Sequence, residues 1–273
     1  VTNTASVDFQ IMQKNIGYTD TWGVGMMAYS DASANGAVKF NYASVSTAFH
    51  KGLDEDGYSQ IGVGFQATYA NMLINTTSLK FEDQLTTAGF TGVTSEIFSN
   101  PAALKSNYID LNAGVLYTGS SNDRNNYYLG VSMYHITRPK QVFTGANYLL
   151  NSRTTIHGGG YFGIGSTTTL HVSALHSMQG GANETVLGTA LQFNVSGEGA
   201  EKPTSFYAGS WLRFKDAIIP YIGLEFDDFR FGATYDINTS SLKTASVNRG
   251  GIEISLIYIR RPNTDKYIHC PKF

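Results

Sequence analysis

The sequence is poor in charge, nearly free of cysteine and without a long apolar run. Only 15% of its 273 residues are charged, well below the quarter that is typical of soluble domains. Its single cysteine, Cys270, excludes an intramolecular disulfide and any metal site built from several cysteines. No stretch of about 18 apolar residues occurs, so a transmembrane helix is not expected. A net charge of −2 and a pI near 6.3 argue against nucleic acid as the main partner.

Alternation of apolar and polar residues is the main pattern that the sequence does contain. In residues 229–238 the odd positions are Phe, Phe, Ala, Tyr and Ile, and the even positions are Arg, Gly, Thr, Asp and Asn. Successive side chains of a strand point to opposite faces, so one face of this segment is apolar and the other polar. Comparable segments of about ten residues recur about a dozen times, which is the signature of an antiparallel transmembrane β-barrel. A mean hydropathy of −0.16 does not contradict this fold, because lipid-facing and lumen-facing residues average out.

The expected fold is therefore all-β, with one barrel over residues 1–260 and a periplasmic tail over 261–273. The alternation predicts strands at 5–13, 21–30, 37–50, 57–70, 108–118, 126–136, 153–164, 168–177, 184–194, 204–214, 217–226, 229–238 and 250–260.

The lengths of the connections predict an orientation in the outer membrane. Long connections at 71–107, 137–152 and 239–249 are expected outside the cell, because transmembrane barrels have short periplasmic turns and longer outer loops. This places the end of the last strand in the periplasm and the start of the first strand outside. Single-chain bacterial barrels have even strand numbers, so we expect about 14 strands, the first of them absent from this chain. The chain also begins without Met or a signal peptide, as a mature or partial product would.

The residue types that carry catalysis or bind metals are scattered. His171 and His176 fall on opposite faces of one expected strand, where they cannot share a metal. His176-Ser177 near Asn183 superficially resembles the Ser/His/Asn chemistry of an outer-membrane phospholipase, but nothing in the spacing brings a base to the serine. The glycines at 158–160 precede neither a helix nor a Gly-Lys-Ser/Thr sequence, so they do not predict a phosphate loop. We expect no catalytic residue, no metal and no cofactor.

One electrostatic feature is expected on the polar face of the sheet. Glu225 and Arg230 flank the short turn at 227–228, so their side chains should lie opposite each other. Neighbouring strands place further charges on the same face, which predicts a lumen salt network of Arg213, Glu225, Arg230, Asp236 and Glu253. Such a network would rigidify the wall, and a binding site is the alternative.

The chain continues past its last expected strand. Pro262 should end that strand, because proline has no backbone N–H to donate. The tail is then either a disordered end or a peptide that docks a periplasmic partner. In the second case the docking residues would be Arg260, Arg261, Tyr267, Ile268, Cys270 and Phe273.

Several segments resemble the PorP/SprF family. They are YIDLNAGVLY at 108–117, YHITRPKQ at 134–141, AIIPYIGLEF at 217–226, YDINTSSLK at 235–243 and RGGIEIS at 249–255. The resemblance implies a non-enzymatic outer-membrane component of the type IX secretion system of Bacteroidota. Its partners would be membrane lipid, periplasmic ring or peptidoglycan-linked components, and gliding adhesins as cargo. The family's usual start, with an Asn-Pro-Ala-Tyr-like motif and a first strand, is absent here, which agrees with the strand expected to be missing.

Transport is the main alternative function. A diffusion porin needs an open lumen, whereas about 14 strands is near the size at which side chains and loops could fill it. A channel for a hydrophobic solute is the other transport role, and an outer-membrane hydrolase comes third.

Overall fold

The computed structural model describes residues 1–91, 94–95, 104–143, 146–196, 204–241 and 249–260. Its main element is one antiparallel sheet of 13 strands, and each strand predicted from the alternation is part of it. The all-β prediction is therefore confirmed. The strand ends differ from the expected ones by a few residues. The strands are β1 (Thr2–Ile11), β2 (Thr21–Ser33), β3 (Val38–Gly52), β4 (Ser59–Ile74), β7 (Leu104–Asn122), β8 (Asn125–Tyr134), β11 (Arg153–Gly163), β12 (Thr168–Gln179), β13 (Ala182–Asn194), β14 (Ser205–Arg213), β15 (Ala217–Phe226), β16 (Phe229–Asn238) and β17 (Arg249–Tyr258).

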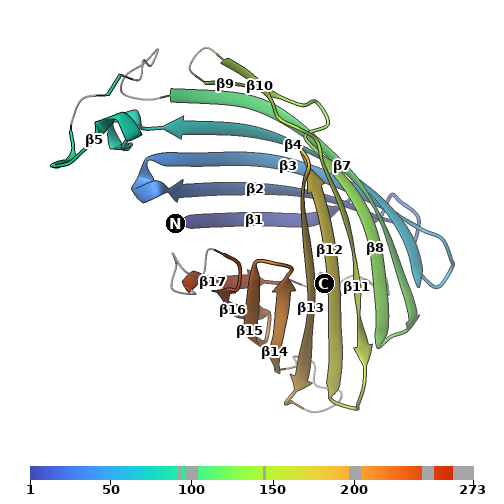
Figure 1. The fold of residues 1–273 in the computed structure, drawn as a ribbon. Helices are drawn as coiled ribbons and strands as arrows, with labels where there is room; N and C mark the ends of the chain where they lie inside the picture. Colours follow the sequence, from blue (N-terminus) through green and yellow to red (C-terminus); the bar gives the residue numbers. More distant parts are fainter. Residues whose placement is uncertain (92–93, 96–103, 144–145, 197–203, 242–248, 261–273) are drawn as a thin grey trace.

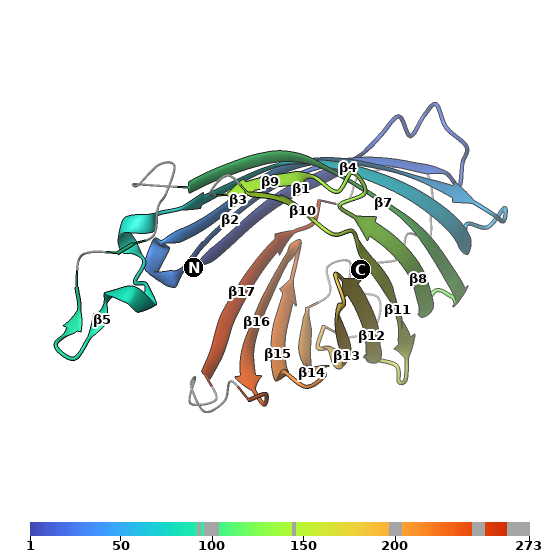
Figure 2. The same cartoon turned by 45° about the horizontal axis from the view of Figure 1, so that its top comes forward.

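The sheet is a meander that curls back on itself. Each of its strands pairs with the next one along the chain. Figure 1 shows β1 to β4 and β7 crossing the upper part of the view, β8 and β11 to β13 descending on the right, and β14 to β17 below. In Figure 2 the same curl brings β17 round toward β1. Within the described residues no backbone pairing joins β1 to β17, so the sheet is open along these two edges.

Short elements occupy the connections. The 3-10 helix η1 (Ala34–Gly36) joins β2 to β3. Beyond β4 come η2 (Thr76–Ser78), η3 (Glu82–Gln84) and the hairpin of β5 (Leu85–Thr86) and β6 (Gly89–Phe90). The alternation predicted none of these elements. Among the described residues, no helix is long and apolar enough to cross a membrane.

Two of the long connections contain more paired backbone than the sequence suggested. Strands β4 and β7 extend into the loop expected at 71–107, to Ile74 and from Leu104. The connection expected at 137–152 holds a second hairpin, of β9 (Lys140–Phe143) and β10 (Ala146–Leu149). This hairpin lies against β7, where the Val142 N–H donates to Ser106 Oγ at 3.3 Å. Both differences have the same cause. Backbone pairing continues into segments whose side chains no longer alternate between apolar and polar.

The register sorts side chains onto the same two faces in every strand. On the inner face Gly64 of β4 lies opposite Ala48 of β3 and Gly114 of β7. One residue further, Phe65 points to the outer face beside Ala113. Because the side-chain period of a strand is two, this register keeps polar and small residues inside the curl and apolar residues outside it.

Aromatic rings cover glycines on the inner face. A Cβ at Gly188 would collide with the indole ring of Trp211, its register partner on β14. Gly159 lies in the same way beneath the ring of Tyr128. The Trp211 indole N–H also donates to Ser173 Oγ at 2.9 Å. These glycines are therefore positions where a ring lies flat against the neighbouring strand, which accounts for part of the high glycine content.

Candidate functional site

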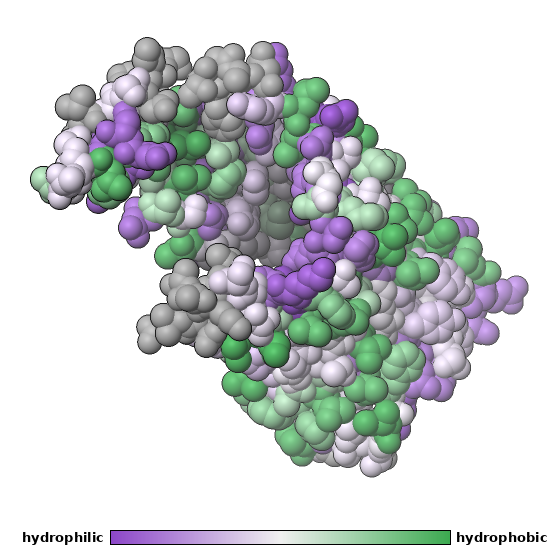
Figure 3. Space-filling view, viewed as in Figure 1, coloured by the Kyte–Doolittle hydropathy of each residue, from purple (hydrophilic) through white to green (hydrophobic). Residues whose placement is uncertain are grey.

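The outer face of the sheet is a broad apolar surface. Large apolar side chains on it are far from buried, with exposed fractions of 61% for Phe65, 68% for Ile109, 59% for Leu129 and 83% for Ile254. In Figure 3 hydrophobic residues predominate over the lower part of the molecule, where β14 and its neighbours lie. Soluble monomers rarely expose contiguous apolar patches beyond a few hundred Å². A face of this kind on every strand is suited to contact with acyl chains.

Outward-facing aromatic residues gather at one end of the strands. We call this the short-turn end, because it carries the turns 123–124 and 227–228, and the opposite one, with the connections 75–103 and 135–152, the long-loop end. All large-sheet strands except β4 and β12 place an outward aromatic near the short-turn end: Phe9, Trp22, Phe49, Tyr117, Tyr127, Phe162, Phe193, Phe206, Phe226, Phe229 and Tyr258. Aromatic girdles of this kind mark the level of the lipid headgroups.

The inner face holds a cavity of about 630 Å³ bordered by β1 to β4, β7, β8 and β11. Glycines such as Gly64 and Gly114 form part of its floor. Polar side chains surround them, among them Gln66 and Asn112, which are joined by an Asn112 Nδ2 to Gln66 Oε1 hydrogen bond of 2.9 Å. The inside of the curl is thus partly hollow, and polar side chains lie around its glycine floor.

Of the five residues predicted as a lumen salt network, four form two separate groups. At the short-turn end the Arg230 guanidinium lies 3.2 Å from Glu225 Oε2. The Tyr207 hydroxyl donates to the same carboxylate oxygen at 2.6 Å. The side chains of Arg230 and Glu225 are 20% and 10% exposed, so the pair is largely withdrawn from water.

The second group lies at the long-loop end around Arg213. Its guanidinium contacts Asp236 at 3.1 Å, Asp216 at 3.0 Å and Glu184 at 3.2 Å. Glu253 is on the same face, opposite Thr234, but it is exposed and has no ion pair within the described residues. The two groups lie at opposite ends of β14. Ser205 and Tyr207 are beside Glu225 at the short-turn end, and Arg213 is at the long-loop end. The prediction of one network did not take this separation into account.

Three partners of these groups were not predicted. Tyr207, Glu184 and Asp216 join them through the register of β13 to β15 and through the turn after β14. The inward parity of Tyr207 was readable from the sequence, since Tyr207 and Arg213 both occupy odd positions of one strand. The register between strands was not, because it depends on turn geometry and pairing.

A buried carboxylate and a histidine form another inner-face contact that sequence reasoning missed. Asp110 Oδ2 lies 2.8 Å from His135 Nδ1, and the His135 backbone N–H donates to Asn112 Oδ1 at 3.0 Å. The Asp110 side chain is only 4% exposed. His135 has a φ of 57°, a left-handed conformation that non-glycine residues seldom adopt. These contacts hold the chain against β7 just after β8 ends, and no residue pattern announces such a backbone conformation.

The histidine and serine considered for hydrolase chemistry point away from each other. His176 is on the outer face, where its Nδ1 lies 2.8 Å from Thr185 Oγ1. Ser177 is on the inner face and bonds Thr155 at 2.8 Å. His171 also faces inward, beside Gln192. In the part of the chain that the structure describes, no three His, Cys, Asp or Glu residues are placed to hold a metal ion.

Most of the predicted docking tail lies outside the described residues. Arg260 is exposed after the end of β17. The positions of Arg261, Tyr267, Ile268, Cys270 and Phe273 all fall in the undescribed range 261–273.

Comparison with known proteins identifies one family. A family model described as "Type IX secretion system membrane protein PorP/SprF" matches residues 1–258, which is nearly the whole chain. No curated protein matches the sequence.

Proposed function

Because the chain belongs to the PorP/SprF family of type IX secretion system membrane proteins, we propose that it is a non-enzymatic outer-membrane barrel of that system in Bacteroidota. In this role it anchors the secretion apparatus in the membrane, or supports export and surface attachment of cargo such as gliding adhesins. The observation that carries the proposal is the outward apolar face, which extends across all strands of the large sheet and ends in an aromatic girdle.

The two ends of the sheet suggest where partners bind. The long connections would face the cell exterior and the short turns the periplasm, following the usual asymmetry of such barrels. Secreted cargo would then meet the long-loop end. Periplasmic ring or peptidoglycan-linked components would meet the short-turn end and the tail at 261–273.

Deletion of residues 261–273 tests the docking role of the tail. We expect the shortened protein to fold and insert normally, and to recover fewer periplasmic type IX components when purified from native membranes. A matched variant with residues 261–273 replaced by a Gly/Ser segment of equal length separates loss of sequence from loss of length. Unchanged recovery of these components by both variants would refute the docking role.

A porin or hydrophobic-solute channel is the second candidate. The inner-face cavity of about 630 Å³ favours it, because a hollow interior is what a permeating solute needs. Conductance of the purified protein in planar bilayers discriminates the two. Steady open conductance would support the porin, and a closed barrel would support the anchoring role.

A further inference from the structure

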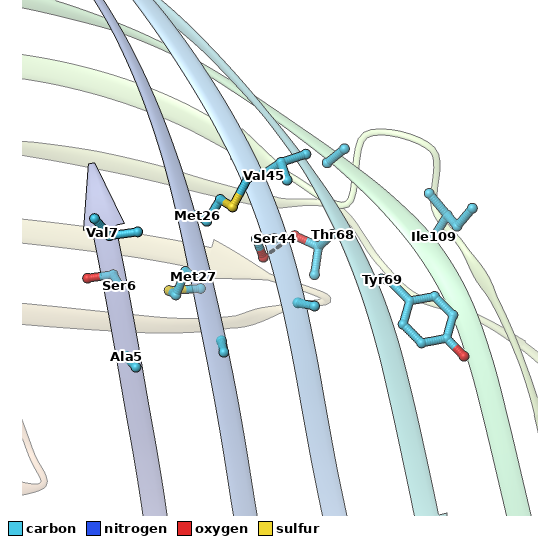
Figure 4. Close-up of a pocket in the computed structure, with 13 residues that line it drawn as sticks. Ala5, Ser6, Val7, Met26, Met27, Ser44, Val45, Thr68, Tyr69 and Ile109 are labelled. Carbon is cyan, nitrogen blue, oxygen red and sulfur yellow. Dashed lines mark hydrogen bonds between the residues drawn. The ribbon is translucent and has the colours of Figure 1, made fainter. Parts of the chain in front are cut away.

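A groove crosses the outer face near the long-loop end. It has a volume of about 740 Å³ and is bordered by β1, β2, β3, β4 and β7. Figure 4 shows Met26, Val45, Tyr69 and Ile109 along it, on four successive strands of the sheet. These four side chains are at least half exposed, at 63%, 54%, 52% and 68%. Ala43, also exposed, provides part of the floor between them. The groove is thus an apolar channel open to whatever surrounds the outer face.

A row of hydrogen-bonding side chains borders the groove on its long-loop side. The register aligns five outward residues across five strands, and these are Asn3, Ser30, Asn41, Asn71 and Asn107. Within the row Ser30 Oγ donates to Asn41 Oδ1 at 2.8 Å, and Asn71 Nδ2 donates to Asn107 Oδ1 at 2.5 Å. Two residues along each strand from the groove toward the long-loop end, amide and hydroxyl side chains take the place of apolar ones.

Two lysines follow immediately beyond that row. Lys39 on β3 and Lys105 on β7 both pair in register with Leu73 on the intervening β4. Their outward side chains therefore lie two strand spacings apart, roughly 10 Å. Both are exposed, and within the described residues neither has an ion-pair partner. Two uncompensated positive charges next to hydrogen-bond donors complement an anionic group.

The depth of the lysines matches a headgroup. Along β3, Lys39 lies ten residues from Phe49, which belongs to the aromatic girdle at the opposite end. Ten residues of strand span about 34 Å, or about 26 Å along the membrane normal at a tilt of about 40°. That is close to the height of about 25 Å expected for the apolar band of a membrane barrel. When the girdle lies at one headgroup level, Lys39 and Lys105 lie at the other.

We propose that this surface binds a phosphate-bearing membrane lipid, with its acyl chain in the groove and its phosphate between Lys39 and Lys105. The asparagine row supplies hydrogen bonds to the polar linkage between phosphate and chain. Charge complementarity selects an anionic lipid over a zwitterionic one, and the groove distinguishes a bound lipid from ordinary annular contact. The inference rests on the proposed membrane location of the outer face.

Native mass spectrometry of the purified full chain tests the proposal. Dioleoylphosphatidylglycerol and dioleoylphosphatidylcholine are the probes, each titrated into detergent micelles. The wild-type protein should retain phosphatidylglycerol in preference to phosphatidylcholine. The double variant K39Q/K105Q should lose this preference, by roughly fivefold for each lysine, which corresponds to about 1 kcal/mol each. Ala43→Trp, which fills the groove and leaves both lysines, should also reduce phosphatidylglycerol retention.

A double variant with the same charge change elsewhere provides the control. Lys14 and Lys215 are exposed and lie in the β1–β2 and β14–β15 connections, so K14Q/K215Q should retain phosphatidylglycerol like the wild type. Equal retention by wild type and K39Q/K105Q, or the same loss in K14Q/K215Q, would overturn the lipid site. Insertion of every variant into phosphatidylcholine vesicles, followed by heat-modifiable electrophoresis, is measured first. A wild-type protein that fails to insert contradicts the membrane location itself, whereas normal insertion without lipid preference contradicts only the site.

Discussion

Glu225 is a carboxylate held among an arginine, a tyrosine hydroxyl and the wall of the sheet. Removing the Arg230 charge leaves it without its cation while it stays largely buried, and uncompensated buried charges are strongly destabilising. We predict that Arg230→Gln lowers the free energy of unfolding by about 2 kcal/mol, less than for a fully buried pair because Arg230 is partly exposed. Urea unfolding of the vesicle-inserted protein measures this loss.

Arg213→Gln is the matched comparison for that substitution. Two of its three carboxylate partners, Glu184 and Asp216, are 50% and 38% exposed, so solvent already screens those charges, and only Asp236 is largely buried, at 16%. The expected loss is at most about 1 kcal/mol. Equal losses of unfolding free energy in the two arginine variants would show that burial of the carboxylate partners does not determine the size of the loss.

Gly188 is a residue whose lack of a side chain can be tested directly. A methyl group there must displace the Trp211 ring and break its hydrogen bond to Ser173. We predict that Gly188→Ala destabilises the protein by about 1–3 kcal/mol and shifts the fluorescence of Trp211. Gly64→Ala is the control, because the nearest neighbour of its new Cβ would be Ala48 Cβ at 3.6 Å, an ordinary contact. Similar losses at both positions would contradict the stacking explanation.

Asp83 organises the connection that follows β4 and is sensitive to pH. The Ser95 backbone N–H, the Ser95 hydroxyl and the Thr94 hydroxyl donate to its carboxylate, and these bonds hold the pKa of Asp83 below its usual range. The ionised Asp83 carboxylate therefore stabilises this connection. The stabilisation is fully present above the unfolded pKa of about 3.9 and is lost as pH falls through the lower folded pKa.

The measurable consequence is loosening of this connection in acid. We predict that protease cleavage between residues 82 and 95 accelerates as pH falls below about 4, and that Asp83→Asn shows the fast cleavage already at neutral pH. Glu82→Gln, a neighbouring change, should cleave like the wild type. An acid-stable protease is needed, and pH-independent cleavage of the wild type would refute the role of Asp83.

At the scale of elements, Pro220 interrupts the pairing of two neighbouring strands. The β15–β16 register runs from Ile218↔Ile237 to Tyr221↔Thr234, with no pairing at Ile219 or Pro220. Proline cannot donate to the ladder and is seldom found inside a sheet. We predict that Pro220→Val restores a donor, slows hydrogen exchange at 234–236 and stabilises the protein by about 1 kcal/mol. Ile222→Val, outward on the same strand, should change neither quantity.

Strands were the most predictable elements, for a physical reason. Each strand of the large sheet has an outer face that meets an apolar surrounding, so its side chains alternate strictly and reveal it. The hairpin β9–β10 and the extensions of β4 and β7 went unpredicted because backbone hydrogen bonds, rather than a burial pattern, hold them. The ion pair of Glu225 and Arg230 was expected from a short turn that fixes its own register. The contact of Asp110 with His135 depends on a left-handed residue and on β7, which local sequence does not specify.

At the scale of the whole molecule, the direction of the edge strands constrains closure. The 13 strands alternate in direction, so β1 and β17 run the same way. Unpaired backbone groups are costly in hydrocarbon, so both edges need partners in the membrane. A single strand of opposite direction would pair antiparallel with each edge, whereas direct closure would require a parallel pair. We predict that such a strand separates β1 from β17 in the inserted protein.

Disulfide trapping measures this separation. Cysteines are introduced one at a time along β1 and along β17, in a Cys270→Ser background, and combined in pairs. A disulfide requires Cβ atoms within about 4.5 Å, whereas two strand spacings are about 10 Å, so no pair should cross-link. The register partners Ala5 and Ala28, replaced by cysteines, provide the positive control. Efficient cross-linking of β1 to β17 would show direct closure instead.

The one-sided aromatic girdle has a mechanical consequence. Ring side chains favour the interfacial layer, so the girdle holds the short-turn end at one depth, whereas on β1 to β4 and β7 the opposite end carries amides and lysines on flexible stems. When the bilayer thickens or thins, the adjustment is therefore taken up at the far rim. In the membrane location proposed above, a partner bound at the short-turn end would therefore keep a constant distance from the headgroup layer on that side.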